Sequence, residues 1–201
     1  SAQIATPEES TFRGNDARLG VYDSPAITAN PTLLWSFDTP RPNRTTPAVV
    51  DGLVFIGNEE GTLYALDIET GAEKWTFKTG GAVVSSGTVT DGKFYFGSLD
   101  NSIYALNAEN GIVLWEYETD GQIYSSPLIV DDVLYIGSLD NHLYTLSTLR
   151  GELIWKFDTG GQVWSSPAFS DGIIVIGSRS GKIIAVDSLT GTEIWTRLNS
   201  S

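Results

Sequence analysis

The sequence predicts an all-β protein, a β-propeller of four-stranded antiparallel blades, and three observations support this class. A tryptophan recurs every 40 residues and divides the chain into four equal units. Each unit holds four short apolar segments between Gly- and Asp-rich turns, and none shows helical periodicity. Four antiparallel strands in about 40 residues make one propeller blade. The rhythmic tryptophans are Trp35, Trp75, Trp115, Trp155 and Trp195.

The repeat sets the domain organisation. We expect an irregular lead-in over residues 1–31, which lack the repeat, and a propeller domain over residues 32–201. Thr32–Phe37 matches the end of a unit that has no beginning, so it is predicted to form one extra outer strand. The four complete units are residues 36–75, 76–115, 116–155 and 156–195.

Turn residues delimit the strands within each unit. Asp51-Gly52 suits a two-residue hairpin with positive φ, whereas Asp131-Asp132 is a poorer version of it. Gly71 supplies positive φ for the turn before the last strand. The strands predicted for the first unit are Thr46–Val50, Leu53–Gly57, Thr62–Asp67 and Ala72–Phe77.

A single blade has two apolar faces and cannot bury both without neighbours. We therefore expect each rhythmic tryptophan to fill the gap between adjacent blades near the rim, in a structural role. The recurring pairs Ser85-Ser86, Ser125-Ser126 and Ser165-Ser166 are expected on the inner strands, where small side chains let blades crowd the axis.

Composition excludes several functions. A net charge of −13 argues against nucleic acid and anionic membrane surfaces, because both require clustered Lys and Arg. No run approaches the roughly 20 apolar residues of a membrane span, so we expect no membrane insertion. Cys and Met are absent, which excludes disulfides and thiolate chemistry. The first residues lack the apolar core of a signal peptide, so any such segment is expected to have been removed.

The units resemble the pyrroloquinoline-quinone-type β-propeller repeat. The stretches that carry the resemblance are SSPLIVDDVLYIGSLDNHLYTL, SSPAFSDGIIVIGSRSGKIIAVDSLTGTEIW and YALDIETGAEKW. Ala65, Gly71 and Trp75 match that family's tryptophan-docking motif, although Thr145 takes the Ala position in the third unit. The family includes quinone-dependent alcohol and glucose dehydrogenases and non-catalytic propellers. The resemblance implies a periplasmic or extracellular protein.

No catalytic constellation is found in the sequence. The resembling dehydrogenases use adjacent cysteines, calcium and a catalytic Asp, and no residue of that site can be carried over. The single histidine, His142, is expected to face solvent, and no Ser–His–Asp arrangement surrounds it. Acidic residues in the loops between second and third strands are expected to form turns, so we predict no metal site and no cofactor, neither calcium nor quinone. These residues are Glu59, Glu60, Asp100 and Asp140, with Arg179 in the fourth loop.

One position varies while its surroundings repeat. It lies just before the first strand of each unit, where the chain should reach the mouth of the central channel. An Arg and two large aromatics there resemble a binding hot spot, although the same side chains could simply plug the channel. The candidate partner-binding residues are Arg44, Tyr124 and Trp164, with Gln122 and Gln162 two positions earlier; Val84 is the fourth equivalent.

Three ring closures and three functions follow as hypotheses. The four blades could close as one ring, two chains could form an eight-bladed ring as a homodimer, or the chain could be part of a larger propeller. We expect a non-catalytic module that binds a protein or peptide on the face with the channel mouth. The alternatives are a quinone- and calcium-dependent dehydrogenase or its remnant, and a self-assembling structural module.

Overall fold

The computed structural model describes residues 30 and 32–198, so almost all of the predicted lead-in lies outside the described residues. Sixteen strands form four antiparallel four-stranded sheets, each in sequential order. The first blade comprises β1 (Ala48–Val50), β2 (Leu53–Gly57), β3 (Thr62–Asp67) and β4 (Glu73–Lys78). The second comprises β5 (Thr88–Thr90), β6 (Lys93–Gly97), β7 (Ser102–Asn107) and β8 (Val113–Glu118). The third comprises β9 (Leu128–Val130), β10 (Val133–Gly137), β11 (His142–Ser147) and β12 (Leu153–Asp158). The fourth comprises β13 (Ala168–Ser170), β14 (Ile173–Gly177), β15 (Lys182–Asp187) and β16 (Glu193–Leu198).

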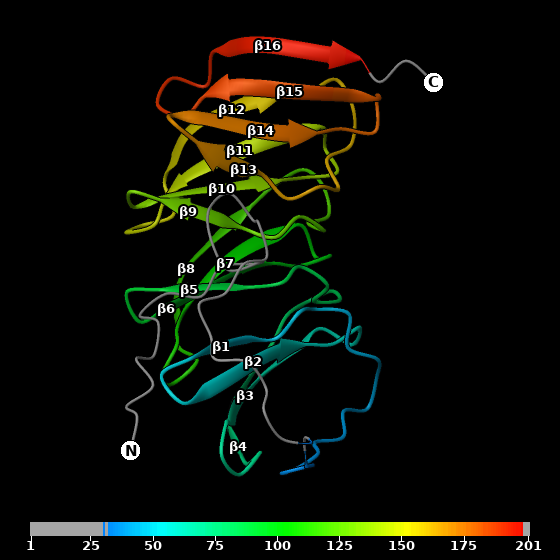
Figure 1. Cartoon of the computed structure of the whole chain (residues 1–201), viewed down its shortest axis with the longest axis vertical. Coiled ribbons are helices and arrows are strands. Elements are labelled where there is room, and N and C mark those ends of the chain that lie inside the picture. The colour runs from blue at the N-terminus through cyan, green and yellow to red at the C-terminus, as the bar shows by residue number, and fades with distance from the viewer. Residues whose placement is uncertain (1–29, 31, 199–201) are drawn as a thin grey trace.

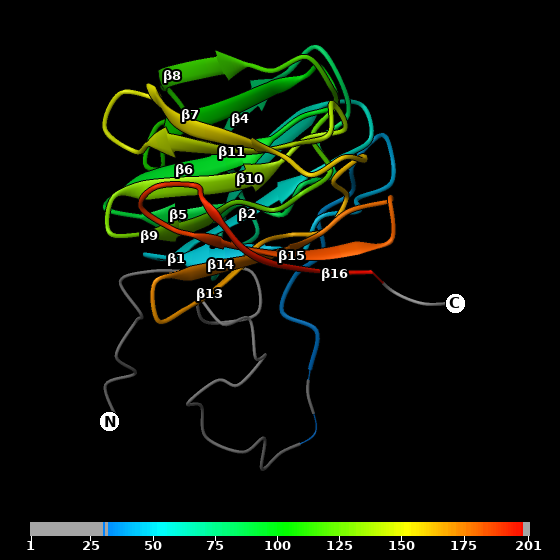
Figure 2. The same cartoon turned by 90° about the horizontal axis from the view of Figure 1, so that it is seen from above.

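The blades are stacked in an open array. Figure 1 shows the first and fourth blades at opposite ends of the long axis, so the four blades do not close on themselves as one ring. Strand β1 contacts β5, and β5 contacts β9, which places the first strand of each blade on the inner side of the array. Figure 2 shows the stack from above.

The hydrophobic core lies between the blades. Each of the three clusters of buried residues draws on two adjacent blades, as expected for sheets that cannot bury both faces alone. The described part of the chain forms no helix, and so it contains no helix that is long and apolar enough to cross a membrane.

Each rhythmic tryptophan that has a following blade docks onto it in the same way. The indole nitrogen donates to a carbonyl 33 residues ahead, for example from Trp115 Nε1 to the Thr148 oxygen at 2.9 Å. The ring lies on a glycine in the following turn, where a Cβ on Gly151 would come within 2.7 Å of Trp115. Gly151 also has a φ of +70°, which favours glycine. The predicted wedge role is therefore confirmed for Trp75, Trp115 and Trp155, and Trp35 docks likewise on the first blade.

The serine pairs join the inner strands. The backbone N–H of Ser86 donates to Ser126 Oγ at 3.1 Å, and that of Ser126 donates to Ser166 Oγ at 2.9 Å. Thr46 N–H begins this ladder by donating to Ser86 Oγ at 2.8 Å. The hydroxyls therefore serve the contacts between blades.

Two predictions about the ends of the array are wrong. Thr32–Phe37 forms no strand, and it contacts the first blade through side chains, with Trp35 Nε1 donating to the Ile68 carbonyl and the Phe37 ring packing on Tyr64. Trp195 fills no gap between blades, since no blade follows it among the described residues, and it is 37% exposed.

Candidate functional site

The candidate site lies at one end of the blades, where two kinds of loop meet. In every unit, the loop between the second and third strands bonds to the residue two places before the variable position. Leu139 N–H donates to the Gln122 carbonyl at 3.0 Å, and Arg179 N–H donates to the Gln162 carbonyl at 2.8 Å. We call this surface the inner-loop end. On this surface, each unit places its variable residue beside a residue of the other loop. The four pairs are Arg44 with Glu59, Val84 with Leu99, Tyr124 with Leu139 and Trp164 with Arg179.

Two of the predicted aromatics come together on this surface. Tyr124 and Trp164 lie on adjacent blades, yet their ring centroids are 4.3 Å apart at an interplanar angle of 28°. Arg179 Cζ is 5.2 Å from the Trp164 ring, a cation–π distance. Trp164 Nε1 donates to Gln162 Oε1 at 3.3 Å. Trp164 is still 41% exposed, so the cluster offers an aromatic surface to a ligand.

Arg44 does not belong to this cluster. It lies on the first blade and forms an exposed ion pair with Glu59. The pairs of the second and third blades separate it from Trp164, and they carry half-buried apolar side chains, Val84, Leu99 and Leu139. The sequence indicated that the four positions are equivalent, but equivalent positions on a stack of blades are not all neighbours.

Gln122 is exposed, and its contact in the structure is through its backbone carbonyl. Sequence reasoning placed Arg179 in a loop series and missed its role against Trp164. The available signal was the fixed spacing: Arg44 and Glu59 are 15 residues apart, as are Trp164 and Arg179.

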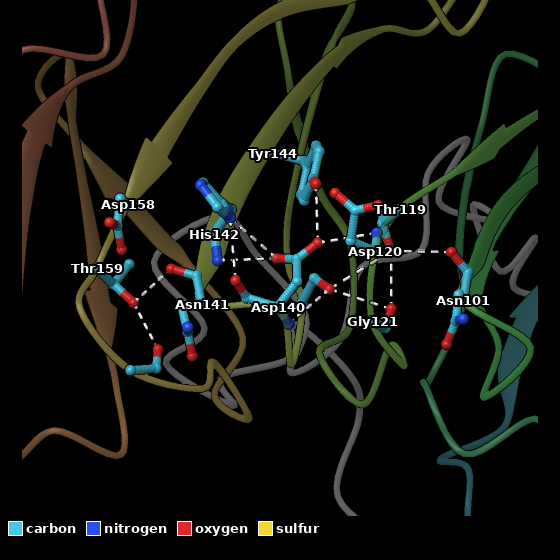
Figure 3. Close-up of polar contacts among 12 residues, drawn as sticks. Asn101, Thr119, Asp120, Gly121, Asp140, Asn141, His142, Tyr144, Asp158 and Thr159 are labelled. Atoms are coloured by element: carbon cyan, nitrogen blue, oxygen red, sulfur yellow. Dashed lines mark hydrogen bonds and ion pairs between the residues drawn. The ribbon is translucent and has the colours of Figure 1, made fainter.

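Two of the acidic loop residues, Asp100 and Asp140, form turns as expected and also connect adjacent blades. Figure 3 shows Asp140 at the centre of such a connection. Its Oδ2 accepts from Asp120 N–H on the preceding loop at 3.1 Å and from the Tyr144 hydroxyl at 2.8 Å. Its Oδ1 accepts from His142 N–H at 3.0 Å. Asp100 makes the equivalent contacts with Gly80 and Tyr104.

The tyrosines in these connections stay protonated. Burial, followed by the hydrogen bond to the Asp140 carboxylate, raises the pKa of Tyr144 well above its ordinary value. Burial and Asp100 do the same for the pKa of Tyr104. Both hydroxyls are therefore fixed as donors, and the carboxylates act as acceptors. No group of three His, Cys, Asp or Glu is placed to hold a metal within residues 30 and 32–198.

The histidine is half-buried, which corrects the expectation that it faces solvent. Its side chain is 26% exposed because it folds back over the loop, with Nδ1 3.2 Å from Asp140 Oδ1. Its Nδ1 also lies 3.1 Å from the Asp140 carbonyl oxygen. No serine hydroxyl bonds to this ring in the described part of the chain, so His142 is part of the loop connection.

The structure is hollowed at the opposite end of the blades. A groove of about 500 Å³ separates the first two blades there, with Phe55 and Ala108 among its apolar lining and Asp51, Asp91 and Glu109 among its polar lining. None of the predicted binding residues lines this groove.

Comparison with known proteins defines the class and then the family. The repeat, the blades and the tryptophan docking define a propeller of the quinoprotein-like type. The model of one family, described as outer membrane protein assembly factor BamB, matches residues 25–130 and 119–201, and the chain belongs to that family. No curated protein sequence matches the chain.

Solved structures show the same fold at low sequence identity. BamB from Moraxella catarrhalis is 22% identical, with a TM-score of 0.75 over 85% of this chain and 57% of that one. A europium-containing methanol dehydrogenase is 18% identical, with a TM-score of 0.79 over 96% and 49%. The quinohemoprotein alcohol dehydrogenase from Comamonas testosteroni is 19% identical, with a TM-score of 0.70 over 80% and 35%. The chain thus spans from about a third to just over half of these solved structures, 35% to 57% of their length.

Proposed function

We propose that this chain is a non-catalytic binding module that holds an extended segment of a protein partner on the inner-loop end, with Tyr124 and Trp164 as the anchor. The exposed stacked pair carries this proposal. Tyr and Trp are enriched at binding hot spots because they supply large contact areas and lose little side-chain entropy on binding. A scaffold of rigid blades holds both rings in place before the partner arrives.

The surroundings of the anchor support a peptide as ligand. The half-buried Val84, Leu99 and Leu139 extend the apolar surface across the two middle blades. Arg179 stacks on the Trp164 ring and forms no ion pair in the described part of the chain, so it is available to a carboxylate of the partner. This pattern suits a segment with apolar side chains and an acidic group near the aromatic anchor.

Family membership supports a partner within outer-membrane protein assembly and a periplasmic or extracellular location. The solved BamB structure is named for such a factor, and the matching family model carries the same description. The dehydrogenases share the fold, and fold alone does not transfer an activity.

Selection from a displayed random-peptide library tests the proposal. Peptides that bind the wild-type chain should bind the Tyr124→Ala/Trp164→Ala variant at least about 30-fold more weakly, the effect of losing about 2 kcal/mol at a hot spot. Arg179→Ala should weaken the acidic peptides selectively. Leu189→Ala is the matched control, because Leu189 is apolar, 81% exposed and lies in a turn at the other end of the blade.

Two results would contradict the proposal. One is peptide binding that survives in the double variant, provided that its thermal melting is unchanged. The other is reduction of a redox dye with alcohols or sugars when the quinone and calcium are added, since turnover would make the chain an enzyme.

A further inference from the structure

The groove between the first two blades lies at the end opposite the inner-loop end, and the proposed peptide binding makes no use of it. We call it the hairpin groove, because Asp51 and Asp91, each the first residue of a hairpin turn, both line it. Its volume is about 500 Å³, and pockets for small molecules occupy about 300–1,000 Å³. The hairpin groove therefore has the size of a small-molecule site.

The junction at this groove lacks a hydroxyl that the next two junctions share. At those junctions a tyrosine of one blade donates its hydroxyl to a carbonyl of the following blade. Tyr95 donates to the Thr148 carbonyl at 3.4 Å, and Tyr135 donates to the Ser188 carbonyl at 3.1 Å. Phe55 takes the tyrosine position at the first junction, so no hydroxyl is present there to donate.

The carbonyl that faces this position has consequently one donor fewer. The Thr148 carbonyl accepts from Trp115 Nε1 at 2.9 Å as well as from Tyr95. Its equivalent, the Ala108 carbonyl, accepts from Trp75 Nε1 at 3.1 Å and from no second donor among the described residues. A carbonyl oxygen has two lone pairs. Because Ala108 lines the hairpin groove, its second lone pair is an acceptor for a bound ligand.

The rim of the hairpin groove carries an excess of negative charge. Its carboxylates are Asp51, Asp91 and Glu109, all exposed, and Lys93 is the cation among the lining residues. None of these four forms an ion pair in the described part of the chain. Three carboxylates against one ammonium attract a cationic ligand, because charges of one sign around a concave surface reinforce one another.

The floor of the hairpin groove is apolar and lies between two stacked sheets. Val50, Leu53 and Phe55 contribute to it from the first blade, and Leu114 contributes from the second. The Phe55 ring stacks on Phe94 of the second blade, with 4.7 Å between centroids and an interplanar angle of 21°. A rigid apolar slot between sheets suits a flat ring.

We propose that the hairpin groove binds a small aromatic amine that carries a hydrogen-bond donor on its ring. The ring lies between the first two blades, and its donor bonds to the Ala108 carbonyl in place of the missing tyrosine hydroxyl. The ammonium group lies among the carboxylates of the rim. This site is independent of the peptide anchor, because Tyr124 and Trp164 lie at the other end of the blades.

A titration with tyramine, followed by NMR chemical shifts of the backbone amides, tests the proposal. Tyramine combines a phenol with an ammonium group, and low salt is used because salt screens exposed charges. Saturable shifts are expected at residues 50–55, 91–93 and 107–109, with a Kd of about 1 mM for a ligand of about ten non-hydrogen atoms. Phenethylamine lacks the hydroxyl and should bind about fivefold more weakly. The anion 3-(4-hydroxyphenyl)propionate should bind at least about tenfold more weakly.

A variant that closes the groove tests the role of the missing hydroxyl. Phe55→Tyr/Ala108→Ser gives the first junction the residue pair that the third junction already holds, Tyr135 and Ser188, so the variant should fold. The new hydroxyl then occupies the Ala108 position's carbonyl. Tyramine binding should fall at least about tenfold, because the ligand loses its hydrogen bond and part of its space.

A second variant tests the charge without altering the turns. Asp51→Asn/Asp91→Asn keeps both hairpins, because Asn-Gly suits the same turn as Asp-Gly, and should weaken tyramine binding about fivefold. Asp171→Asn is the matched control, since it changes the equivalent hairpin of the fourth blade outside the groove lining, and should bind like the wild type. Tyr124→Ala/Trp164→Ala should also bind tyramine like the wild type, which separates this site from the peptide site.

Three results would overturn the proposal. One is an absence of saturable shifts at the groove residues of the wild type at tyramine concentrations up to about 10 mM. Another is tyramine binding by Phe55→Tyr/Ala108→Ser that equals that of the wild type. The third is equal binding of the propionate and of tyramine, since the rim would then select no cation.

Discussion

Replacing Trp115 by alanine should destabilise the monomer far more than replacing Trp195, although the two residues occupy the same place in the repeat. Trp115 is 8% exposed, packs 5.8 Å from the Tyr95 ring and donates its N–H to Thr148. Truncation leaves a cavity between the second and third blades, and Trp→Ala changes in cores cost about 3–5 kcal/mol. Trp195 is 37% exposed and has no acceptor among the described residues, so about 1 kcal/mol is expected.

Urea unfolding followed by far-UV circular dichroism measures both changes, at a protein concentration where scattering gives the monomer mass. The difference between the two variants should be about 2–4 kcal/mol, because the substitution is the same and the following blade differs. Equal losses for the two variants would refute the role of the tryptophans as wedges between blades.

Two further predictions concern single carboxylates. Asp132 has a φ of 62° in a hairpin where the other units place glycine, so Asp132→Gly should raise the free energy of unfolding by about 0.5–1 kcal/mol in urea unfolding; a loss of stability would contradict the strain. The hydrogen bonds from Lys74 and Thr70 lower the pKa of Asp67 from 3.8 to about 2. Its contribution to stability is therefore present above pH 3.8 and is lost as pH falls towards 2. A carbon-13 NMR titration checks the pKa, which Lys74→Ala should raise, and an ordinary value in the wild type would refute the pairing.

Much of the fold could be predicted because the repeat presents each turn four times. The predicted bounds of β2 and β3 agree with the structure, since Asp-Gly hairpins and Gly turns limit them closely. Strand β1 starts at Ala48, two residues later than predicted. The reason is that Thr46 N–H bonds to Ser86 of the next blade instead of continuing the ladder.

The ends of the array could not be predicted from the repeat. A pattern shows that Trp35, Trp115 and Trp195 are equivalent, but burial depends on which neighbours are present. The segment at Trp35 keeps the docking contact and loses the strand, whereas Trp195 keeps the strand and has no docking contact among the described residues.

The candidate site was also predicted only in part, because the repeat shows which positions are equivalent and not which of them are neighbours. The variable position pointed to Tyr124 and Trp164 as candidates, and the structure brings their rings together across two blades. Arg44 was grouped with them by equivalence, yet it pairs with Glu59 on the first blade. Arg179 reaches Trp164 from another loop of the same blade, a contact that only the recurring 15-residue spacing could have indicated.

Hydrogen–deuterium exchange with a selected peptide bound tests the central claim most directly, because it locates the bound segment on the blades without any substitution. We predict slower exchange at Gln122–Tyr124, at Gln162–Trp164 and at Arg179, the backbone that surrounds the aromatic pair. Protection confined to the opposite end, around the groove beside Phe55 and Ala108, would contradict the account, as would protection that is absent from both ends.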